Sequence, residues 1–209
     1  MRVDEEPKVL KTGPSLPGSM TAGGFRKLRE EMERYDAARE RIIKRSRDLA
    51  KESKQAIYAL QRDAKEEAVQ HLKAAEGVIG ELLPMVQGDP TLRTGGLSAG
   101  MEEYVEACAL FHFLEQGTLL PRSRVAASTP EEYLGGIADL TGELVRYAVL
   151  RATKGDRATV QRARDVVDTI SGALSQFDLR GDLRRKYDSV KYALQRLEQV
   201  LYDLALRPE

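Results

Sequence analysis

Four carboxylates in two short stretches are the residues of this sequence best suited to chemistry. Glu103 and Glu106 belong to EYVEACALFHFL, and at about 100° per helical residue they share a face with buried-type leucines. Asp139 and Glu143 repeat the pattern in DLTGELVRYAVL, four residues apart and on the face of Leu150. Acids on an apolar helix face lose hydration and repel one another, so they require a partner that compensates their charge.

A divalent cation is one such partner. If the two stretches pack with their acidic faces opposed, the four carboxylates converge, and hard oxygen ligands favour Mg²⁺, Mn²⁺ or Ca²⁺ over zinc. Gly135 and Gly136 flank the second pair, and their lack of a side chain lets another helix come close. The alternative is structural, because Glu143 and Arg146 have the i,i+3 spacing of a simple ion pair.

Other catalytic groups are scarce. His71 and His112 belong to no HExxH pattern, and Cys108 has no second cysteine with which to form a zinc site or a disulfide. Phosphate-binding glycine motifs are missing too. A lone cysteine favours a reducing compartment, and the sequence has neither a signal peptide at its start nor an apolar run of membrane-spanning length. These features predict a cytoplasmic protein without a membrane contact.

Helices must position the four acids. The 209 residues are 32% charged and 42% hydrophobic, with a formal net charge of zero, and their Ala/Leu/Glu/Arg-rich composition favours helix. Residues 1–24 hold three prolines and four glycines, so they are predicted to form a flexible arm. Residues 25–209 are predicted to form a single helical domain.

Apolar residues recur at helical spacing through most of that domain. Residues 25–83 are too long for one ordinary helix and predict two helices with a break, whereas 84–100, rich in Pro and Gly, predict a long loop. Cap residues are expected at Gly117, Thr129 with Glu132, Gly155 and Asp156. Four further helices are expected at about 98–116, 130–154, 157–177 and 180–207. The expected fold class is all-α, an elongated bundle of about six or seven helices.

The sequence also resembles the translin family, and within it the translin-associated protein X (TRAX) branch. The similarity covers most of the chain from about residue 25, and four stretches carry it: SRDLAKESKQAIYALQR (46–62), EEYVEACALFHFL (102–114), YLGGIADLTGELVRYAV (133–149) and LRRKYDSVKYALQRLEQVLYDLALR (183–207). The resemblance implies an all-α fold of about seven helices that assembles into a hollow, barrel-shaped octamer.

An activity is implied as well. Members of the TRAX branch are metal-dependent endoribonucleases, so the resemblance implies Mg²⁺-dependent hydrolysis of single-stranded RNA inside the barrel, with Mn²⁺ as an alternative metal. The family's active-site carboxylates correspond to Glu103, Glu106, Asp139 and Glu143, both as metal ligands and as catalytic residues. Translin-type subunits lack the full set and mainly bind nucleic acid. The alternative is therefore a non-catalytic protein that binds single-stranded RNA or DNA.

Two departures from eukaryotic relatives affect the expected partners. The chain is short and has no compact Lys/Arg-rich run near its start, which favours a prokaryotic or archaeal lineage. In such a lineage one gene supplies every subunit, so a homo-oligomer is expected rather than an assembly with a translin-like subunit.

Because the net charge is zero, RNA must be met by local basic patches. Each candidate patch has a solvated helix face as its alternative. The candidates are Arg26, Lys27 and Arg29; Lys44, Arg45 and Arg47; and Arg184, Arg185 and Lys186.

Overall fold

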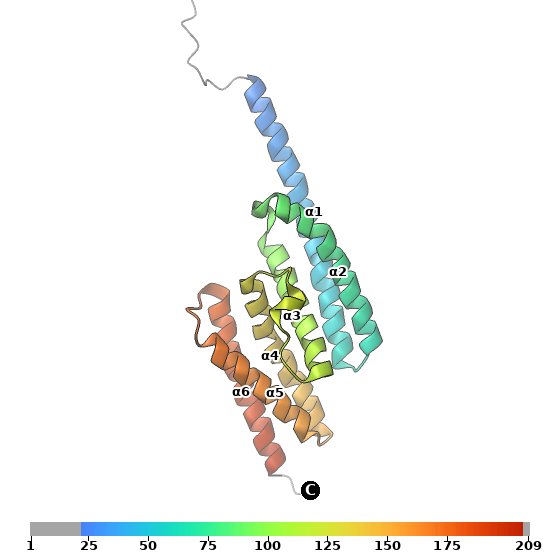
Figure 1. Ribbon diagram of the computed structural model, residues 1–209, viewed down its shortest axis with the longest axis vertical. Helices are drawn as coiled ribbons and strands as arrows, with labels where there is room; N and C mark the ends of the chain where they lie inside the picture. The colour runs from blue at the N-terminus through green and yellow to red at the C-terminus, as the bar shows by residue number, and fades with distance from the viewer. Residues whose placement is uncertain (1–21, 207–209) are drawn as a thin grey trace, which may run out of the picture. The chain divides into compact units, whose positions relative to one another are not determined.

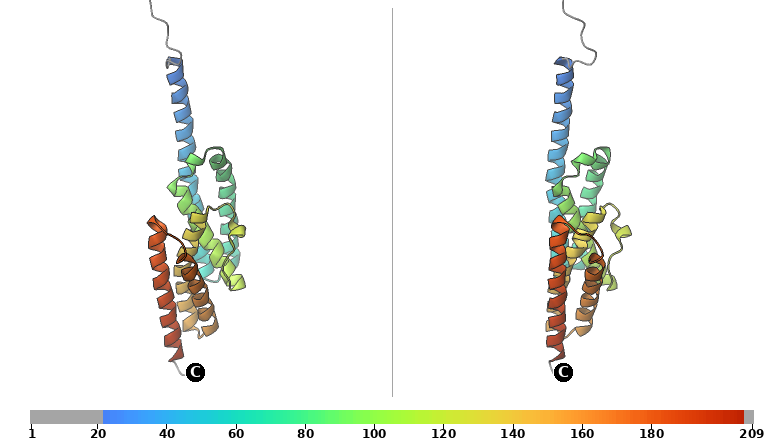
Figure 2. Two further views of the ribbon diagram at one scale, coloured as in Figure 1. Left: turned by 60° about the vertical axis from the view of Figure 1, so that its left-hand side comes forward. Right: turned by 90° about the vertical axis from the view of Figure 1, so that its left-hand side faces the viewer.

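The computed structural model describes residues 22–206, and throughout this range the ordered elements are helices (Figures 1 and 2). The expectation of an all-α fold with six or seven helices is confirmed. None of the helices in this range combines the length and the apolarity needed to cross a membrane. The elements are α1 (Ala22–Gln61), α2 (Lys65–Gly88), the 3₁₀ helix η1 (Pro90–Leu92), α3 (Gly95–Gln116), the 3₁₀ helix η2 (Arg122–Val125), α4 (Pro130–Thr153), α5 (Arg157–Leu174) and α6 (Gly181–Ala205).

The chain divides into two units after Ala37. In the first unit, the described residues 22–37 form the first part of α1, and large apolar side chains on it are exposed, with Phe25 at 63% and Met32 at 67%. Residues 1–21 of the expected arm lie outside the described range. Residues 22–24 are already helical, so regular structure begins slightly earlier than the composition suggested.

The second unit is organised around α4, which packs against α3, α5 and α6. In Figures 1 and 2, the part of α1 that belongs to this unit lies beside α2, while α5 and α6 lie side by side at the other edge. The core contains fully buried aliphatic side chains from the inner helices, including Leu110 of α3, Leu140 and Leu144 of α4, and Leu197 of α6. The burial of these side chains drives the packing.

Local signals set several helix ends as expected. The Thr129 side chain accepts a hydrogen bond from the backbone N–H of Glu132, and the Glu132 carboxylate accepts one from the Thr129 N–H. This capping box satisfies donors that the first turn of α4 leaves unpaired. The Asp156 carboxylate likewise accepts from the Thr159 N–H at the start of α5. Gly117 ends α3 with φ of 70°, a conformation that glycine adopts without strain.

The prediction of a long loop over residues 84–100 is largely wrong. Helix α2 continues through Pro84 to Gly88, and α3 already begins at Gly95. Leu82 and Val86 on either side of Pro84 are buried, so tertiary packing holds the helix together despite the hydrogen bond that proline cannot donate. The break between the first two helices falls at residues 62–64, where Asp63 has φ of 61°.

Candidate active site

Two glycines bring α3 and α4 into backbone contact at the acidic stretches. A Cβ added to Gly136 would lie 2.5 Å from the carbonyl oxygen of Glu102 and 2.7 Å from the Cβ of Val105. One added to Gly135 would lie 2.6 Å from Cδ of Glu102. At Gly136, where a backbone oxygen is the neighbour, only glycine allows the close approach that the sequence predicted, whereas the flexible Glu102 side chain beside Gly135 can shift. The contact brings the acid-bearing faces of the two helices together.

Glu106 is the buried member of the four predicted carboxylates. Its residue is 8% exposed. Burial, together with the negative charges of Asp139, Glu103 and Glu143, raises its pKa to about 8, although the Lys186 ammonium acts in the opposite direction. The other three acids come from both α3 and α4. The structure therefore brings the predicted residues into one electrostatically coupled group, which we call the carboxylate cluster (Glu103, Glu106, Asp139, Glu143).

Helix α1 supplies partners to two members of the cluster. Lys54 Nζ lies 3.1 Å from Glu103 Oε1, and Gln61 Nε2 donates to Glu143 Oε2 at 2.7 Å and to the Glu143 carbonyl at 3.1 Å. Gln61 is itself buried, so it fixes the orientation of the Glu143 carboxylate. The simpler i,i+3 pairing of Glu143 with Arg146 is present only at 3.8 Å.

Helix α6 supplies a cation. Lys186 Nζ donates to Asp139 of the cluster and to Glu102, a fifth acid that lies on α3. The Lys186 side chain is 24% exposed. Burial alone would lower its pKa, but the hydrogen bonds to Asp139 and Glu102 outweigh burial and raise the pKa above the usual lysine value. Lys186 thus lies within the acidic group instead of on a solvated helix face.

The chemistry of this donor set suits a hard divalent cation. Four carboxylates provide oxygen ligands of the type that Mg²⁺ and Mn²⁺ prefer, and Glu106 lacks an ion-pair partner among residues 22–206. In the arrangement described for those residues, no three His, Cys, Asp or Glu side chains are grouped as ligands of a single metal ion. The carboxylates of Glu103, Asp139 and Glu143 instead point to Lys54, Lys186 and Gln61.

The remaining basic candidates lie in different surroundings. Arg26, Lys27 and Arg29 are exposed on the first unit, and Lys44 is exposed on the second. Arg45 is turned to α2, where its guanidinium donates to Glu81 at 2.8 and 2.9 Å, and it also pairs with Asp48. Arg184 and Arg185 form exposed ion pairs within α6, with Asp188 and Asp182. These pairs contribute little to stability and leave the cations accessible.

Arg47 differs from its neighbours in sequence because it lines a groove. The groove has a volume of about 470 Å³ and lies between α1, which contributes Arg39, Arg47 and Lys54, and the start of α3 at Gly95. Glu103 lines the same groove, so the basic side leads to the carboxylate cluster. A polyanion could be held here by arginine and lysine side chains close to the acids.

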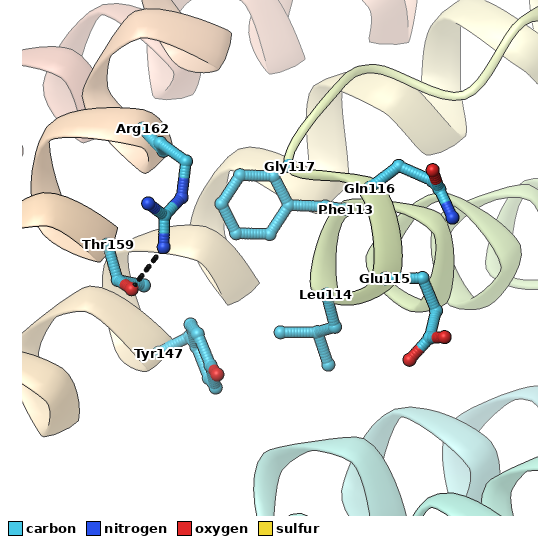
Figure 3. A pocket seen from close by; sticks show the side chains of 8 residues that line it. All are labelled: Phe113, Leu114, Glu115, Gln116, Gly117, Tyr147, Thr159 and Arg162. Atoms are coloured by element: carbon cyan, nitrogen blue, oxygen red, sulfur yellow. Dashed lines mark hydrogen bonds between the residues drawn. The ribbon is translucent and has the colours of Figure 1, made fainter.

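A separate pocket of about 330 Å³ lies at the C-terminal end of α3, and no member of the cluster lines it. Within it, Arg162 donates to the Thr159 hydroxyl at 2.7 Å (Figure 3). Its lining combines aromatic and polar side chains without a nucleophile–base pair, so the candidate chemistry remains at the cluster. The lining residues are Phe113, Leu114, Glu115, Gln116, Gly117, Tyr147, Thr159 and Arg162.

The fold and the cluster define a class: an all-helical protein with a group of acids, one of them buried, at the contact of two central helices. The sequence profile of the Translin family matches residues 37–208. The chain belongs to the Translin family, as the resemblance predicted.

Known relatives agree with this assignment. Translin-associated protein X of Rattus norvegicus is 24% identical over 225 aligned residues, covering 88% of this chain and 78% of that protein. Translin of Gallus gallus is 36% identical over 78 residues, covering 37% of this chain and 34% of that protein.

Solved structures share the fold. The crystal structure of apo-NeC3PO has a TM-score of 0.78 at 24% identity, covering 92% of this chain and all of that one (100%). The structure of an AfC3PO–duplex RNA complex has a TM-score of 0.77 at 25% identity, covering 87% of this chain and 96% of that one.

Three residues of the site were missed by reasoning from the sequence alone. Lys54 and Gln61 are seven residues apart, a spacing that places them on one face of α1. This shared face is the signal in the sequence that could have indicated their contacts with α3 and α4. Glu102 adjoins Glu103 but lies on a neighbouring part of the helix surface, where Gly135 leaves room for it. Its role depends on α6, which no local pattern indicates.

Proposed function

We propose that the protein is a metal-dependent endoribonuclease that hydrolyses RNA phosphodiester bonds within an oligomer. The observation that carries the proposal is the burial of Glu106 beside the charges of Glu103, Asp139 and Glu143. Uncompensated buried acids are costly, and a cation site is a reason for a sequence to retain them. The relation to translin-associated protein X and the AfC3PO complex with duplex RNA support RNA as the ligand.

The cluster residues have distinct roles in this proposal. Glu103, Glu106, Asp139 and Glu143 would hold Mg²⁺ or Mn²⁺, and a bound metal of this kind polarises the phosphodiester and lowers the pKa of water. Gln61 holds the Glu143 carboxylate in one orientation through its amide. Glu106 must lose its proton to act as a ligand, so binding should strengthen as pH rises toward 8.

The substrate strand would enter along the groove that contains Arg39, Arg47 and Lys54. Phosphate contacts position a strand without reading its sequence, and the chain has few aromatic residues for base stacking. Weak sequence preference is therefore expected. Single-stranded RNA is the substrate expected from the sequence, and the duplex in the AfC3PO structure makes double-stranded RNA the second one to test.

A second function, RNA binding without cleavage, is favoured by one observation. Three of the four acids already contact Lys54, Gln61 or Lys186, which compensates charge without a metal. Under this alternative the three acids would only join α1 to α3 and α4, and α6 to α4.

Cleavage of labelled RNA separates the two functions. The full chain is incubated with single-stranded and duplex RNA, with Mg²⁺ or with a chelator, and compared with Asp139→Asn. Asp165→Asn is the matched control, because Asp165 is an exposed acid on α5 outside the cluster. We expect Mg²⁺-dependent fragments from wild type and the control, and a loss of several orders of magnitude in Asp139→Asn. A gel shift without fragments would support the binding function instead.

A further inference from the structure

Lys186 ties three helices together at the edge of the carboxylate cluster. Its ammonium on α6 donates to Glu102 on α3 and to Asp139 on α4. Among the lysines that form ion pairs within residues 22–206, its side chain is the least exposed, at 24% compared with 44% for Lys191. Gly135 leaves the space that the Glu102 side chain occupies. The Glu102 carboxylate can therefore accept the hydrogen bond from Lys186.

The two partners of Lys186 differ in their relation to the cluster. Asp139 is one of the four acids proposed to hold a divalent cation, whereas Glu102 is not. A lysine ammonium and a divalent cation repel each other, so each weakens the binding of the other beside the Asp139 carboxylate. Glu102 can still hold Lys186 when Asp139 is released.

We propose that Lys186 is the resident counter-cation of Asp139 and competes with the divalent metal, and that Glu102 retains the displaced ammonium. This inference rests on the proposed function, because it assumes that the cluster binds a cation. Lys186 is a positioning residue here: it acts through Asp139 and regulates access to the cluster.

The surroundings of Lys186 leave room for such a movement. An open pocket of about 360 Å³ adjoins its side chain, between the first turns of α3 and α6. Gly95, Ser98 and Ala99 line it on the α3 side, together with Glu102. These small residues allow a long side chain to turn away from Asp139 and keep its contact with Glu102.

Metal affinity of the full chain, measured by titration calorimetry with Mg²⁺ and with Mn²⁺, tests this inference. We expect Lys186→Gln to bind both metals more tightly, on the order of tenfold, and to melt at a lower temperature than wild type in chelator. Lys191→Gln is the matched control on the same helix, because Lys191 pairs with Asp188 on the exposed face. It should leave metal affinity unchanged. Unchanged or weaker metal binding by Lys186→Gln would overturn the inference, since a lysine that only braces the helices gives that result.

A second variant decides the case if Lys186→Gln does not fold. Glu102→Gln removes the alternative partner, so Lys186 is held by Asp139 alone and metal affinity should fall several-fold. Unchanged or higher affinity in Glu102→Gln would contradict the retention of the displaced ammonium. RNA cleavage measured in parallel keeps the two proposals separate. If Lys186→Gln binds metal more tightly but wild type does not cleave RNA, only the proposed nuclease function is refuted. If wild type cleaves RNA but Lys186→Gln has unchanged metal affinity, only the proposed competition between Lys186 and the metal is refuted.

Discussion

Gly136 of α4 lies against the main chain of Glu102 on α3, so closely that a Cβ on Gly136 would stand 2.5 Å from the Glu102 carbonyl oxygen. This contact sets the separation of the two helices at the carboxylate cluster. Backbone atoms cannot turn aside as a flexible side chain can, so any side chain at this position forces the helices apart.

Gly136→Ala should therefore destabilise the protein by about 1–3 kcal/mol or more through overpacking, and should lower Mg²⁺-dependent cleavage because the acids of α3 and α4 move apart. Gly142→Ala is the matched control on the same helix, since an added Cβ there meets nothing within 4 Å. It should be neutral or stabilise by up to about 1 kcal/mol. Urea unfolding of both variants measures the difference, and equal effects would show that the glycine contact does not set the helix separation.

The buried acid predicts a dependence of stability on pH in the absence of metal. The folded-state pKa of Glu106 is about 8, above its ordinary value of 4.5. Between these values the folded state holds a proton that the unfolded state has lost, so the free energy of unfolding falls as pH rises. The full effect is on the order of a few kcal/mol.

Glu106→Gln should remove this dependence. The variant should resemble wild type near pH 4.5 and be more stable than wild type near pH 8. Melting temperatures in chelator across this range provide the measurement. Parallel curves for the two proteins would mean that Glu106 is not held protonated by its surroundings.

Glu143→Gln tests the role of the cluster charge. Gln61 can still donate to the amide oxygen at position 143, and one negative charge is removed from beside Glu106, so apo stability should stay level or rise. Mg²⁺-dependent cleavage should fall by orders of magnitude, while RNA binding should persist.

The ion-pair interpretation of Glu143 makes the opposite prediction, namely lost stability with no effect on cleavage. Arg146→Gln is the companion variant. The Arg146–Glu143 ion pair is 3.8 Å long and the Arg146 side chain is exposed, so the pair should contribute less than about 1 kcal/mol to the free energy of unfolding. Full cleavage by Glu143→Gln would remove Glu143 from the proposed site.

Arg47 provides a test of RNA binding, and Arg45 provides the matched control. Arg47 lines the groove beside Glu103, whereas Arg45 is held by Glu81 and Asp48. Arg47→Ala should weaken RNA binding and reduce the salt dependence of log K by about one phosphate contact. Arg45→Ala should leave both nearly unchanged. Fluorescence anisotropy at several salt concentrations measures this, and equal losses in the two variants would place the strand elsewhere.

Assembly is the remaining prediction. Large apolar side chains are exposed on α6, including Tyr192 at 72% and Tyr202 at 59%. The family resemblance predicts an octamer, and the departures from eukaryotic relatives predict identical subunits. Light scattering at micromolar concentration should report a particle several times the 23.3 kDa chain mass. A monomer under these conditions would contradict the proposed oligomer.

The sequence by itself determined the helical class, the caps at Thr129 and Asp156, and the two acid pairs. Each of these depends on residues within a few positions of one another, where helix geometry relates spacing directly to a shared face. The glycine pair Gly135–Gly136 was informative for a similar reason, because the absence of a side chain has one main steric consequence.

Only the tertiary structure decided which faces meet. The partners of the acids come from distant parts of the sequence. Lys54 is 49 positions from Glu103, Gln61 is 82 from Glu143, and Lys186 is 47 from Asp139. Helical periodicity says nothing about such pairings. Arg45 and Arg47 look equivalent in sequence but face different neighbours. Pro84, a helix breaker by local preference, lies inside α2 because Leu82 and Val86 are buried on either side. Local spacing defines the faces of one helix, whereas burial of the whole core determines how the faces of different helices combine.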